Sequence, residues 1–542
     1  MTTQPVFFTL NDMPLMKFTT LSKSLLAASL TLWLTSTSVL ANIKLASPFA
    51  DHMVLQHNTA VPIWGWADPG EKVTVKLGKQ SVSTTTGSDG KWMLKLNKLM
   101  AGGPYTLTAT GKNTLTVNDV YAGEVWVCSG QSNMDFTVAR EDRYWCGVYN
   151  EKEEVAAADY PLIRVFDTDF SPRATPQDTV KGKWEVVSPQ TIGHLSAVAY
   201  FFAREIQKKM KIPIGLITSA FGASTAEAWI RKEALEKDTT FKKLLTSFDA
   251  KIEKYNSDTS GRAAYREAME KWRVVAAKAK AEGKDEVRPP RNPNPDPIRD
   301  QHNPYVLWNG MVKPLVPYAI KGALWYQGES NSPTASIYRQ IMETLITDWR
   351  NQWGQGNFPF LYVQLANIGK TYDSLPSFGG SEAIKREAQL QNLSLPNTGM
   401  AVAIDNANPE DMNDVHPKNK QDIGYRLALA AQAIAYGDKK VVHSGPLYDK
   451  MEVNGKNIKL YFKHTGTGLV AKDGLLKGFA IAGEDKKFVW ANAKIEGNTV
   501  VVSSPEIGNP VAVRYGYGRN PPTSLYNKEK LPASPFRTDA GK

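Results

Sequence analysis

The sequence predicts an α/β protein in which a domain with a mostly parallel sheet lies between two β-sandwich-like domains. Short β-like runs alternate with helical periodicity over residues 119–440, as they do in doubly wound α/β folds. Residues 42–118 and 441–542 instead contain short alternating strands separated by turn residues, which is typical of small β-sandwiches. A chain of 542 residues is also too long for a single hydrophobic core. We therefore expect three domains after a leader over residues 1–41.

The leader has the features of a secretion signal. Lys17 and Lys23 precede an apolar run over residues 25–34, and small residues ending at Ala41 offer a cleavage site. A translation start at Met16 would give this signal its usual length. The apolar run is too short to span a bilayer. We therefore expect an exported protein, periplasmic or secreted, without a membrane anchor.

The two flanking domains are predicted from alternation and turn chemistry. In the first, alternating runs at residues 61–67 and 72–76 are separated by an Asp-Pro-Gly turn at residues 68–70. Proline presets such a bend and glycine completes it. In the last domain, a Gly-Asn turn at residues 497–498 leads into the alternating run at residues 499–503. Both regions therefore favour antiparallel β structure.

The central domain is predicted from its succession of strands and helices. The β-like runs are residues 124–128, 162–166, 214–219, 322–326, 359–365 and 399–404. Helical periodicity covers residues 196–210, 337–353, 381–393 and 420–436. An interruption at residues 231–303 begins as a charged helical stretch and ends in a proline-rich segment that cannot be regular. We interpret it either as an insertion or lid at the rim of a site or as a surface excursion.

Composition argues against several classes of partner. The net charge of +11 is spread along the chain without a dense Lys/Arg stripe, so nucleic acid is not an expected partner. No Cys/His cluster has zinc spacing and no phosphate-binding loop occurs, so we expect no metal and no cofactor. Cys128 and Cys146 could pair after export, or they could stay apart as buried thiols, since Cys128 lies in a predicted strand.

Ser132 is a candidate nucleophile because of its place after a predicted strand. The mostly apolar run at residues 125–129 leads into a tight Gly-Gln-Ser-Asn turn, in which Gly130 permits a sharp bend. In an open α/β sheet, ligands bind at the carboxyl ends of the strands. A hydroxyl held there beside a base is suited to nucleophilic catalysis, although an N-cap serine would also fit this turn.

His416 is the candidate base among the seven histidines. It lies between a predicted strand and the helix that follows, and so at the same edge of the sheet as Ser132. Asp414, two residues earlier, is the preferred acid to hold one tautomer of His416 and to raise its basicity. Glu329 and Asp411 are alternative orienting acids.

Hydrogen-bond donors for an oxyanion are expected from three turns at the same edge. The backbone N–H of Ser132 is one candidate, and Gly222, after another predicted strand, lets a second N–H approach closely. The side-chain amides of Gln327 and Asn331 follow a further strand and offer more donors. Each donor of this kind is typically worth about 3 kcal/mol of transition-state stabilisation.

Several blocks of the sequence resemble the signature blocks of sialate O-acetylesterases in the SGNH (GDSL-like) hydrolase superfamily. Three of them carry the candidate residues: Gly-Gln-Ser-Asn-Met at residues 130–134, Trp-Tyr-Gln-Gly-Glu-Ser-Asn at residues 325–331 and Asp-Val-His-Pro at residues 414–417. Further blocks lie at residues 53–56, 64–66, 102–105, 309–311, 478–482 and 531–538. The likeness therefore covers nearly the whole mature chain. It implies that residues 119–440 form an SGNH-hydrolase-like three-layer α/β/α domain.

The resemblance also implies roles for the residues in the matching blocks. These are Ser132 as nucleophile, His416 as base, Gly222 as an oxyanion donor, Gln327 as a side-chain donor and Asn331 as its fallback. The superfamily often places its aspartate three residues before the histidine, where this chain has Asn413. Either Asp414 substitutes for that aspartate, or the enzyme works with a Ser–His pair.

We therefore predict an exported serine esterase that removes O-acetyl groups from sugars. O-acetylated sialic acids are the first expected substrates, and acetylated xylan or another plant polysaccharide is the second. Two other functions compete with this prediction. One is a non-catalytic carbohydrate-binding protein, and the other is a glycosidase that uses Glu329 with a second carboxylate. No second carboxylate is singled out by its position.

Overall fold

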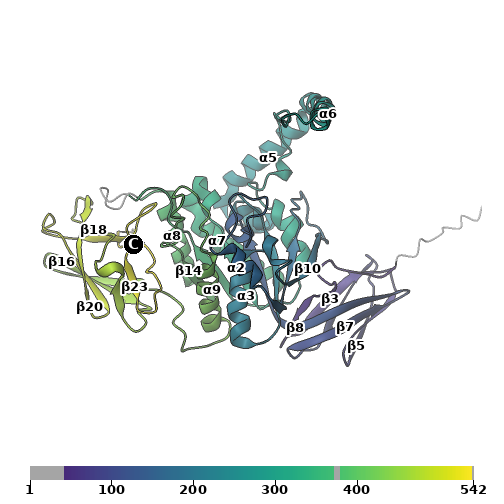
Figure 1. Ribbon diagram of the computed structural model, residues 1–542, viewed down its shortest axis with the longest axis horizontal. Coiled ribbons are helices and arrows are strands. Elements are labelled where there is room, and N and C mark those ends of the chain that lie inside the picture. Colours follow the sequence, from purple (N-terminus) through teal and green to yellow (C-terminus); the bar gives the residue numbers. More distant parts are fainter. Residues whose placement is uncertain (1–41, 372–378, 540–542) are drawn as a thin grey trace, which may run out of the picture. The chain divides into compact units, whose positions relative to one another are not determined.

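The computed structural model describes residues 42–371 and 379–539, so the predicted secretion signal lies outside the described residues. Within them the chain forms an α/β fold with one large mixed sheet and several smaller sheets (Figure 1). No helix in these two ranges combines the length and the hydropathy that crossing a bilayer requires. The predicted α/β class is confirmed.

The large sheet contains the strands that position the candidate residues. In the order in which neighbours pair, its main path is β10 (Gly182–Val187), β9 (Tyr160–Thr168), β11 (Ile214–Ala220), β8 (Thr114–Gly130), β12 (Gly322–Tyr326), β13 (Phe360–Gln364) and β14 (Thr398–Val402). Every pairing along this path is parallel except that of β10 with β9. The carboxyl ends of β8, β11, β12 and β14 therefore lie along one edge of the sheet.

β8 continues from one part of the fold into another. Its first half pairs with β7 (Gly102–Thr110) and β2 (Val54–Gln56), and its second half pairs with β11 and β12. β4 (Lys72–Leu77) pairs with β7, and β5 (Gln80–Thr85) pairs with β4, so that both extend the sheet beyond β7. A separate sheet consists of β1 (Lys44–Leu45), β3 (Val61–Trp66) and β6 (Lys91–Leu96). The domain boundary predicted between residues 118 and 119 falls inside one continuous strand.

Burial on both faces of the central strands explains their apolar runs. β12 and β13 are buried at every position, as expected of parallel strands that are covered on both sides. Neighbouring residues of β8 belong to different hydrophobic clusters, Val127 to one and Trp126 to the other. α3 (Ala197–Met210) and α9 (Lys420–Ile434), which pack side by side, contribute to the cluster of Trp126 (Figure 1). α7 (Tyr338–Trp353) contributes to the cluster of Val127.

The remaining helices are short or belong to the interruption at residues 231–303. They are α1 (Ser132–Asp135), α2 (Glu151–Ala156), α4 (Lys232–Glu236), α5 (Lys242–Ser257), α6 (Thr259–Ala281) and α8 (Ser381–Gln391). After α6, residues 282–296 form neither helix nor strand, because their prolines lack the N–H that regular structure needs.

The C-terminal region forms three smaller sheets with antiparallel pairings. Their strands, in pairing order, are β15 (Leu447–Asn454), β16 (Asn457–Lys463), β21 (Thr499–Ser503) and β20 (Asn492–Glu496); β17 (Leu469–Ala471) and β23 (Leu525–Asn527); and β19 (Phe488–Trp490), β18 (Phe479–Ala482), β22 (Ala512–Tyr515) and β24 (Phe536–Arg537). These strands have a hydrophobic cluster of their own, which includes Leu460, Val500 and Phe536.

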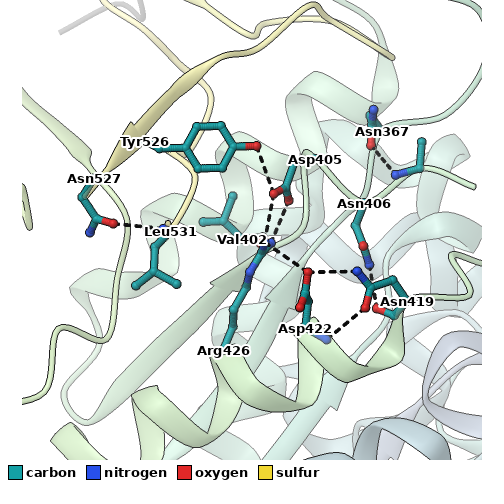
Figure 2. Close-up of polar contacts among 11 residues, drawn as sticks. Asn367, Val402, Asp405, Asn406, Asn419, Asp422, Arg426, Tyr526, Asn527 and Leu531 are labelled. Atoms are coloured by element: carbon teal, nitrogen blue, oxygen red, sulfur yellow. Dashed lines mark hydrogen bonds and ion pairs between the residues drawn. The ribbon is translucent and has the colours of Figure 1, made fainter. Parts of the chain in front are cut away.

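Polar contacts fix the ends of the loop that connects β14 to α9 (Figure 2). Arg426 on α9 pairs with Asp405 through two contacts, of 2.7 Å from Nη1 and 2.9 Å from Nη2. The hydroxyl of Tyr526 donates to the same carboxylate at 3.1 Å. The side chain of Asn406 donates to the carbonyl oxygen of Asn419 at 3.0 Å, which joins the two ends of the loop. This loop carries the predicted base.

Candidate active site

Ser132 lies immediately beyond the end of β8. Gly130 ends the strand with a φ of 141°. A Cβ atom at this position would lie 2.1 Å from the carbonyl oxygen of Tyr326, so only glycine fits. Ser132 then begins α1 and is 6% exposed. The bend therefore brings a nearly buried hydroxyl to the carboxyl edge of the sheet.

His416 lies in the loop between β14 and α9, with its imidazole against Ser132. Nε2 of His416 is 2.9 Å from Oγ of Ser132, and Nδ1 is 2.8 Å from Oδ1 of Asp414. The indole of Trp145 lies beside the imidazole, with 4.7 Å between the ring centroids and 33° between the ring planes. Hydroxyl, imidazole and carboxylate thus form a continuous hydrogen-bonded series, which is suited to activating Ser132 as a nucleophile.

The Asp414 carboxylate is held in its charged form. Burial alone would raise the pKa of Asp414, but hydrogen bonds from the side chain and the backbone of His416 lower this pKa more, so that it lies below its ordinary value. The carboxylate therefore accepts a hydrogen bond from the N–H at Nδ1 of His416, which leaves Nε2 able to take the proton of the Ser132 hydroxyl.

The two alternative acids have other partners. Oε1 of Glu329 accepts a hydrogen bond from Nδ2 of Asn133 at 2.5 Å. Oδ1 of Asp411 accepts one from the backbone N–H of Asn413 at 2.9 Å. Of the three carboxylates considered from the sequence, Asp414 is therefore the one that the structure places against the imidazole.

Two backbone N–H groups beside the hydroxyl lack an acceptor. Gly222 lies in the loop after β11, where a Cβ atom would be 3.7 Å from Cβ of Ser132. Neither the N–H of Gly222 nor that of Ser132 donates a hydrogen bond to another residue in the described part of the chain. Both are therefore available to an oxyanion that forms next to Oγ of Ser132.

The side-chain amides of Gln327 and Asn331 are used inside the protein. Nε2 of Gln327 donates to the carbonyl oxygen of Ser224 at 3.0 Å and to Oδ1 of Asn331 at 2.6 Å. Nδ2 of Asn331 donates to Glu227 at 2.7 Å and to Thr334 at 2.9 Å. This geometry leaves no amide hydrogen of either residue for an oxyanion, contrary to the role expected for them. They instead fix the loop that follows β11.

Asn133 and Lys420, which the sequence did not single out, connect the two halves of the site. Asn133 follows the candidate nucleophile and donates to the carbonyl oxygen of Val415 at 2.9 Å. Nζ of Lys420 donates to Oδ1 of Asn133 and to the carbonyl oxygen of Pro417, both at 2.6 Å. The only signals were the position of Asn133 beside the serine and that of Lys420 four residues after the histidine, at the start of α9. Neither spacing identifies a hydrogen-bond partner.

The buried Lys420 should make stability depend on pH. Burial lowers the pKa of Lys420 from 10.5 to about 7. The unfolded chain keeps the ordinary value, so between these two pH values the unfolded state binds more protons than the folded state. The free energy of unfolding should therefore rise as the pH increases through this window, and Lys420→Met should lack this rise. Thermal denaturation of both proteins across the window measures it. A constant difference in Tm would contradict the assignment.

The two cysteines are free and buried, so the buried-thiol alternative holds. Burial raises the pKa of both Cys128 and Cys146, which keeps both thiols neutral at physiological pH. Across residues 42–371 and 379–539, no group of three or more His, Cys, Asp or Glu side chains is arranged to hold a metal ion.

The chain matches a family model described as a carbohydrate esterase, sialic acid-specific acetylesterase, over residues 122–274 and 304–433. The matched segments contain Ser132, Gly222 and His416, and they leave residues 275–303 unmatched between them.

Relatives and a solved structure extend the similarity over most of the chain. The sialate O-acetylesterase of Rattus norvegicus is 30% identical over 543 residues, which cover 91% of this chain and 94% of the relative. The sialate O-acetylesterase of Homo sapiens is 29% identical over 540 residues, which cover 91% and 92%. The crystal structure of a carbohydrate acetylesterase from Xanthomonas citri is 33% identical, with a TM-score of 0.75, and covers 92% of this chain and 100% of that chain.

Proposed function

The chain belongs to the sialate O-acetylesterase family and is a carboxylic ester hydrolase; from this premise we propose that it removes O-acetyl groups from sugars through a Ser–His–Asp acyl-enzyme mechanism. The observation that carries this mechanism is the 2.9 Å contact between Oγ of Ser132 and Nε2 of His416. Family membership gives the reaction class, and the contact supplies a nucleophile with a base in hydrogen-bonding reach.

The first half of the reaction acetylates the enzyme. Oγ of Ser132 attacks the acetyl carbonyl carbon while Nε2 of His416 takes the hydroxyl proton, and the carbonyl oxygen becomes an oxyanion. Asp414 stabilises the imidazolium that forms, because its carboxylate is charged and 2.8 Å from Nδ1. When the carbon–oxygen bond to the sugar breaks, His416 returns the proton to the sugar oxygen, and the deacetylated alcohol leaves.

The second half releases acetate. Nε2 of His416 takes a proton from a water molecule, whose oxygen attacks the acyl carbon, and the proton then returns to Oγ of Ser132 as the ester bond breaks. In both halves the backbone N–H groups of Ser132 and Gly222 receive the oxyanion, because both are free of other acceptors among the described residues. Gln327 and Asn331 contribute indirectly, through the hydrogen bonds that hold the loop of Gly222.

O-acetylated sialic acids are the first proposed substrates, and acetylated xylan is the second. Release of acetate from a panel of O-acetylated sialic acids, acetylated xylan and an aryl acetate tests the proposal. We expect the highest kcat/KM on an acetylated sialic acid. A clear preference for acetylated xylan would indicate plant polysaccharide as the substrate. Failure to release acetate from any compound of the panel would contradict the esterase proposal.

The two competing functions have less support. A non-catalytic binding protein would have no need of a serine hydroxyl 2.9 Å from a histidine that is itself paired with a carboxylate. A glycosidase would need Glu329 and a second carboxylate facing one substrate. The Glu329 carboxylate instead accepts a hydrogen bond from Asn133.

We also propose the finer architecture and the export of the protein. The region from the second half of β8 to residue 440 would form an SGNH-hydrolase-like three-layer α/β/α domain, which shares β8 with a β-sandwich-like domain before it, and residues 441–542 would form a second β-sandwich-like domain. The two hydrophobic clusters on opposite sides of β8 support the layered domain. N-terminal sequencing of protein from the periplasm and the culture medium tests export. We expect Asn42 as the first residue, and full-length protein confined to the cytoplasm would contradict it.

A further inference from the structure

A large groove lies in the insertion, away from the hydrogen-bonded series of the active site. It has a volume of about 790 Å³ and is formed by α5, α6 and the segment at residues 292–301. Its walls include Tyr255, Tyr265, Arg266, Asn292, Arg299 and Gln301. The volume lies within the range of small-molecule sites in proteins. The lining therefore combines two tyrosines, three arginines and three side-chain amides.

The charged side chains in the groove differ in whether they have hydrogen-bond partners. Arg266 and Arg299 are exposed, and their guanidinium groups form no hydrogen bond or ion pair within residues 42–371 and 379–539. The two aspartates in the lining have partners. Asp296 accepts the backbone N–H of Ile298 at 2.9 Å, and Asp300 pairs with His302 at 2.6 Å. Three arginines against two aspartates give the lining a net charge of +1, and the two guanidinium groups without a partner are its free charges.

Arg262, the third arginine in the lining, has its guanidinium group engaged by other residues of the insertion. Nε of Arg262 donates to the carbonyl oxygen of Asp258 at 3.1 Å, and Nη2 donates to that of Asn256 at 3.2 Å. Its guanidinium also lies 4.6 Å from the ring centroid of Tyr255. Arg262 therefore serves the structure of the insertion, whereas Arg266 and Arg299 remain available to a ligand.

Gln301 joins the groove to the active site. Its side chain donates to the carbonyl oxygen of Gly222 at 3.4 Å, and its own carbonyl oxygen accepts the N–H of Thr225 at 3.4 Å. Gly222 is the residue whose Cβ position would lie 3.7 Å from Cβ of Ser132. One wall of the groove is thus bonded to the loop that borders the nucleophile.

The same wall lies in residues 275–303, which the family model leaves unmatched between its two matched segments. The groove therefore combines α5 and α6, which are matched up to residue 274, with a segment that lies between the two matched ranges. Ser132, His416 and Asp414 do not line the groove, so a ligand bound there would present a part of the substrate other than the acetyl ester.

We propose that this groove binds a carboxylate-bearing sugar residue of the glycan whose O-acetyl group is cleaved at Ser132. Guanidinium groups bind carboxylates through two parallel hydrogen bonds, which Arg266 and Arg299 are free to donate. Tyrosine rings offer flat apolar faces to a sugar ring, and side-chain amides such as Asn292 bind its hydroxyls. The inference rests on the proposed function, because it names a second subsite for the same substrate. The sugar acid is either a sialate or a uronate.

The double variant Arg266→Gln/Arg299→Gln tests whether the groove makes the enzyme prefer acidic over neutral glycans. We would measure kcat/KM for an O-acetylated oligosialic acid, an acetylated glucuronoxylan oligosaccharide and a neutral acetylated xylo-oligosaccharide. For one acidic glycan, the ratio of kcat/KM to that of the neutral glycan should fall roughly tenfold, mainly through KM. The loss should shrink at high salt, because exposed charges are screened. Whichever acidic glycan responds identifies the sugar acid.

Arg273→Gln is the matched control, since Arg273 also lies on α6 but pairs with Glu270 at 2.7 Å. This control should leave the ratio of kcat/KM for each acidic glycan to that for the neutral glycan unchanged. Equal ratios in the wild type and the double variant would overturn the groove proposal. Binding of the responsive acidic oligosaccharide to Ser132→Ala protein, with and without the two arginine substitutions, separates the groove proposal from the esterase proposal. Weaker binding with the substitutions supports the groove even if no ester is hydrolysed, and unchanged binding overturns it.

Discussion

Ser132→Ala should lower kcat for hydrolysis of an aryl acetate and of an O-acetylated sugar by about 10⁴-fold or more. The reason is that no other hydroxyl stands within hydrogen-bonding distance of Nε2 of His416 among the described residues. Steady-state kinetics, together with labelling by a fluorophosphonate probe, measures the loss. The variant should fold normally, because it removes only a hydroxyl whose hydrogen-bond partner is the imidazole of His416.

Ser330→Ala provides a matched serine control in the same region of the site. Its backbone N–H donates to Gln131 at 3.2 Å, a contact that the substitution preserves, and its hydroxyl has no partner in the described part of the chain. We expect kcat close to that of the wild type and normal probe labelling. Turnover or probe labelling that survives in Ser132→Ala would show that another group is the nucleophile.

The residues that sequence could identify are those whose position along a strand carries the information. Ser132 and His416 each follow a buried run, and parallel strands bring their carboxyl ends to one edge, so their meeting could be predicted. Asp414 could be preferred because a residue two before the histidine can reach its ring. The bend at Gly130 was also foreseeable, and the structure gives its reason in the approach of Tyr326.

What the sequence could not identify depends on which polar group reaches which partner. Gln327 and Asn331 were expected to face the oxyanion because they follow a strand end. Their amides bond to Ser224 and Glu227 instead, through contacts that span about a hundred residues of chain. The boundary after residue 118 was placed at a change of composition, whereas the backbone continues through it as β8. Composition does not reveal that one strand can serve two neighbouring parts of a sheet.

Lys420→Met should lower kcat by roughly 100-fold while changing KM little, because displacements of about 1 Å among reacting groups can cost that much. Nζ of Lys420 holds Asn133 and Pro417, the residues directly after the nucleophile and after the base. Methionine has a similar volume but cannot donate a hydrogen bond. The two loops would then lose the contact that sets the distance between hydroxyl and imidazole.

The effect on stability is a weaker test than the effect on kcat. Removing the ammonium relieves the cost of burying it, but it leaves two acceptors without a donor, at about 1–3 kcal/mol each. These changes have opposite signs, so Tm alone does not reveal the role of Lys420. The split between kcat and KM does, because a merely structural role would lower the amount of folded enzyme without changing its turnover.

Lys418→Met separates a positioning role from a general loss of charge near the base. Lys418 lies two residues before Lys420 and pairs with Glu410 at 2.6 Å on the surface. We expect its kcat to stay close to that of the wild type. Active-site titration gives the concentration of folded enzyme for each variant. If Lys420→Met turned over at the wild-type rate per active site, the bridge between the two loops would have no part in catalysis.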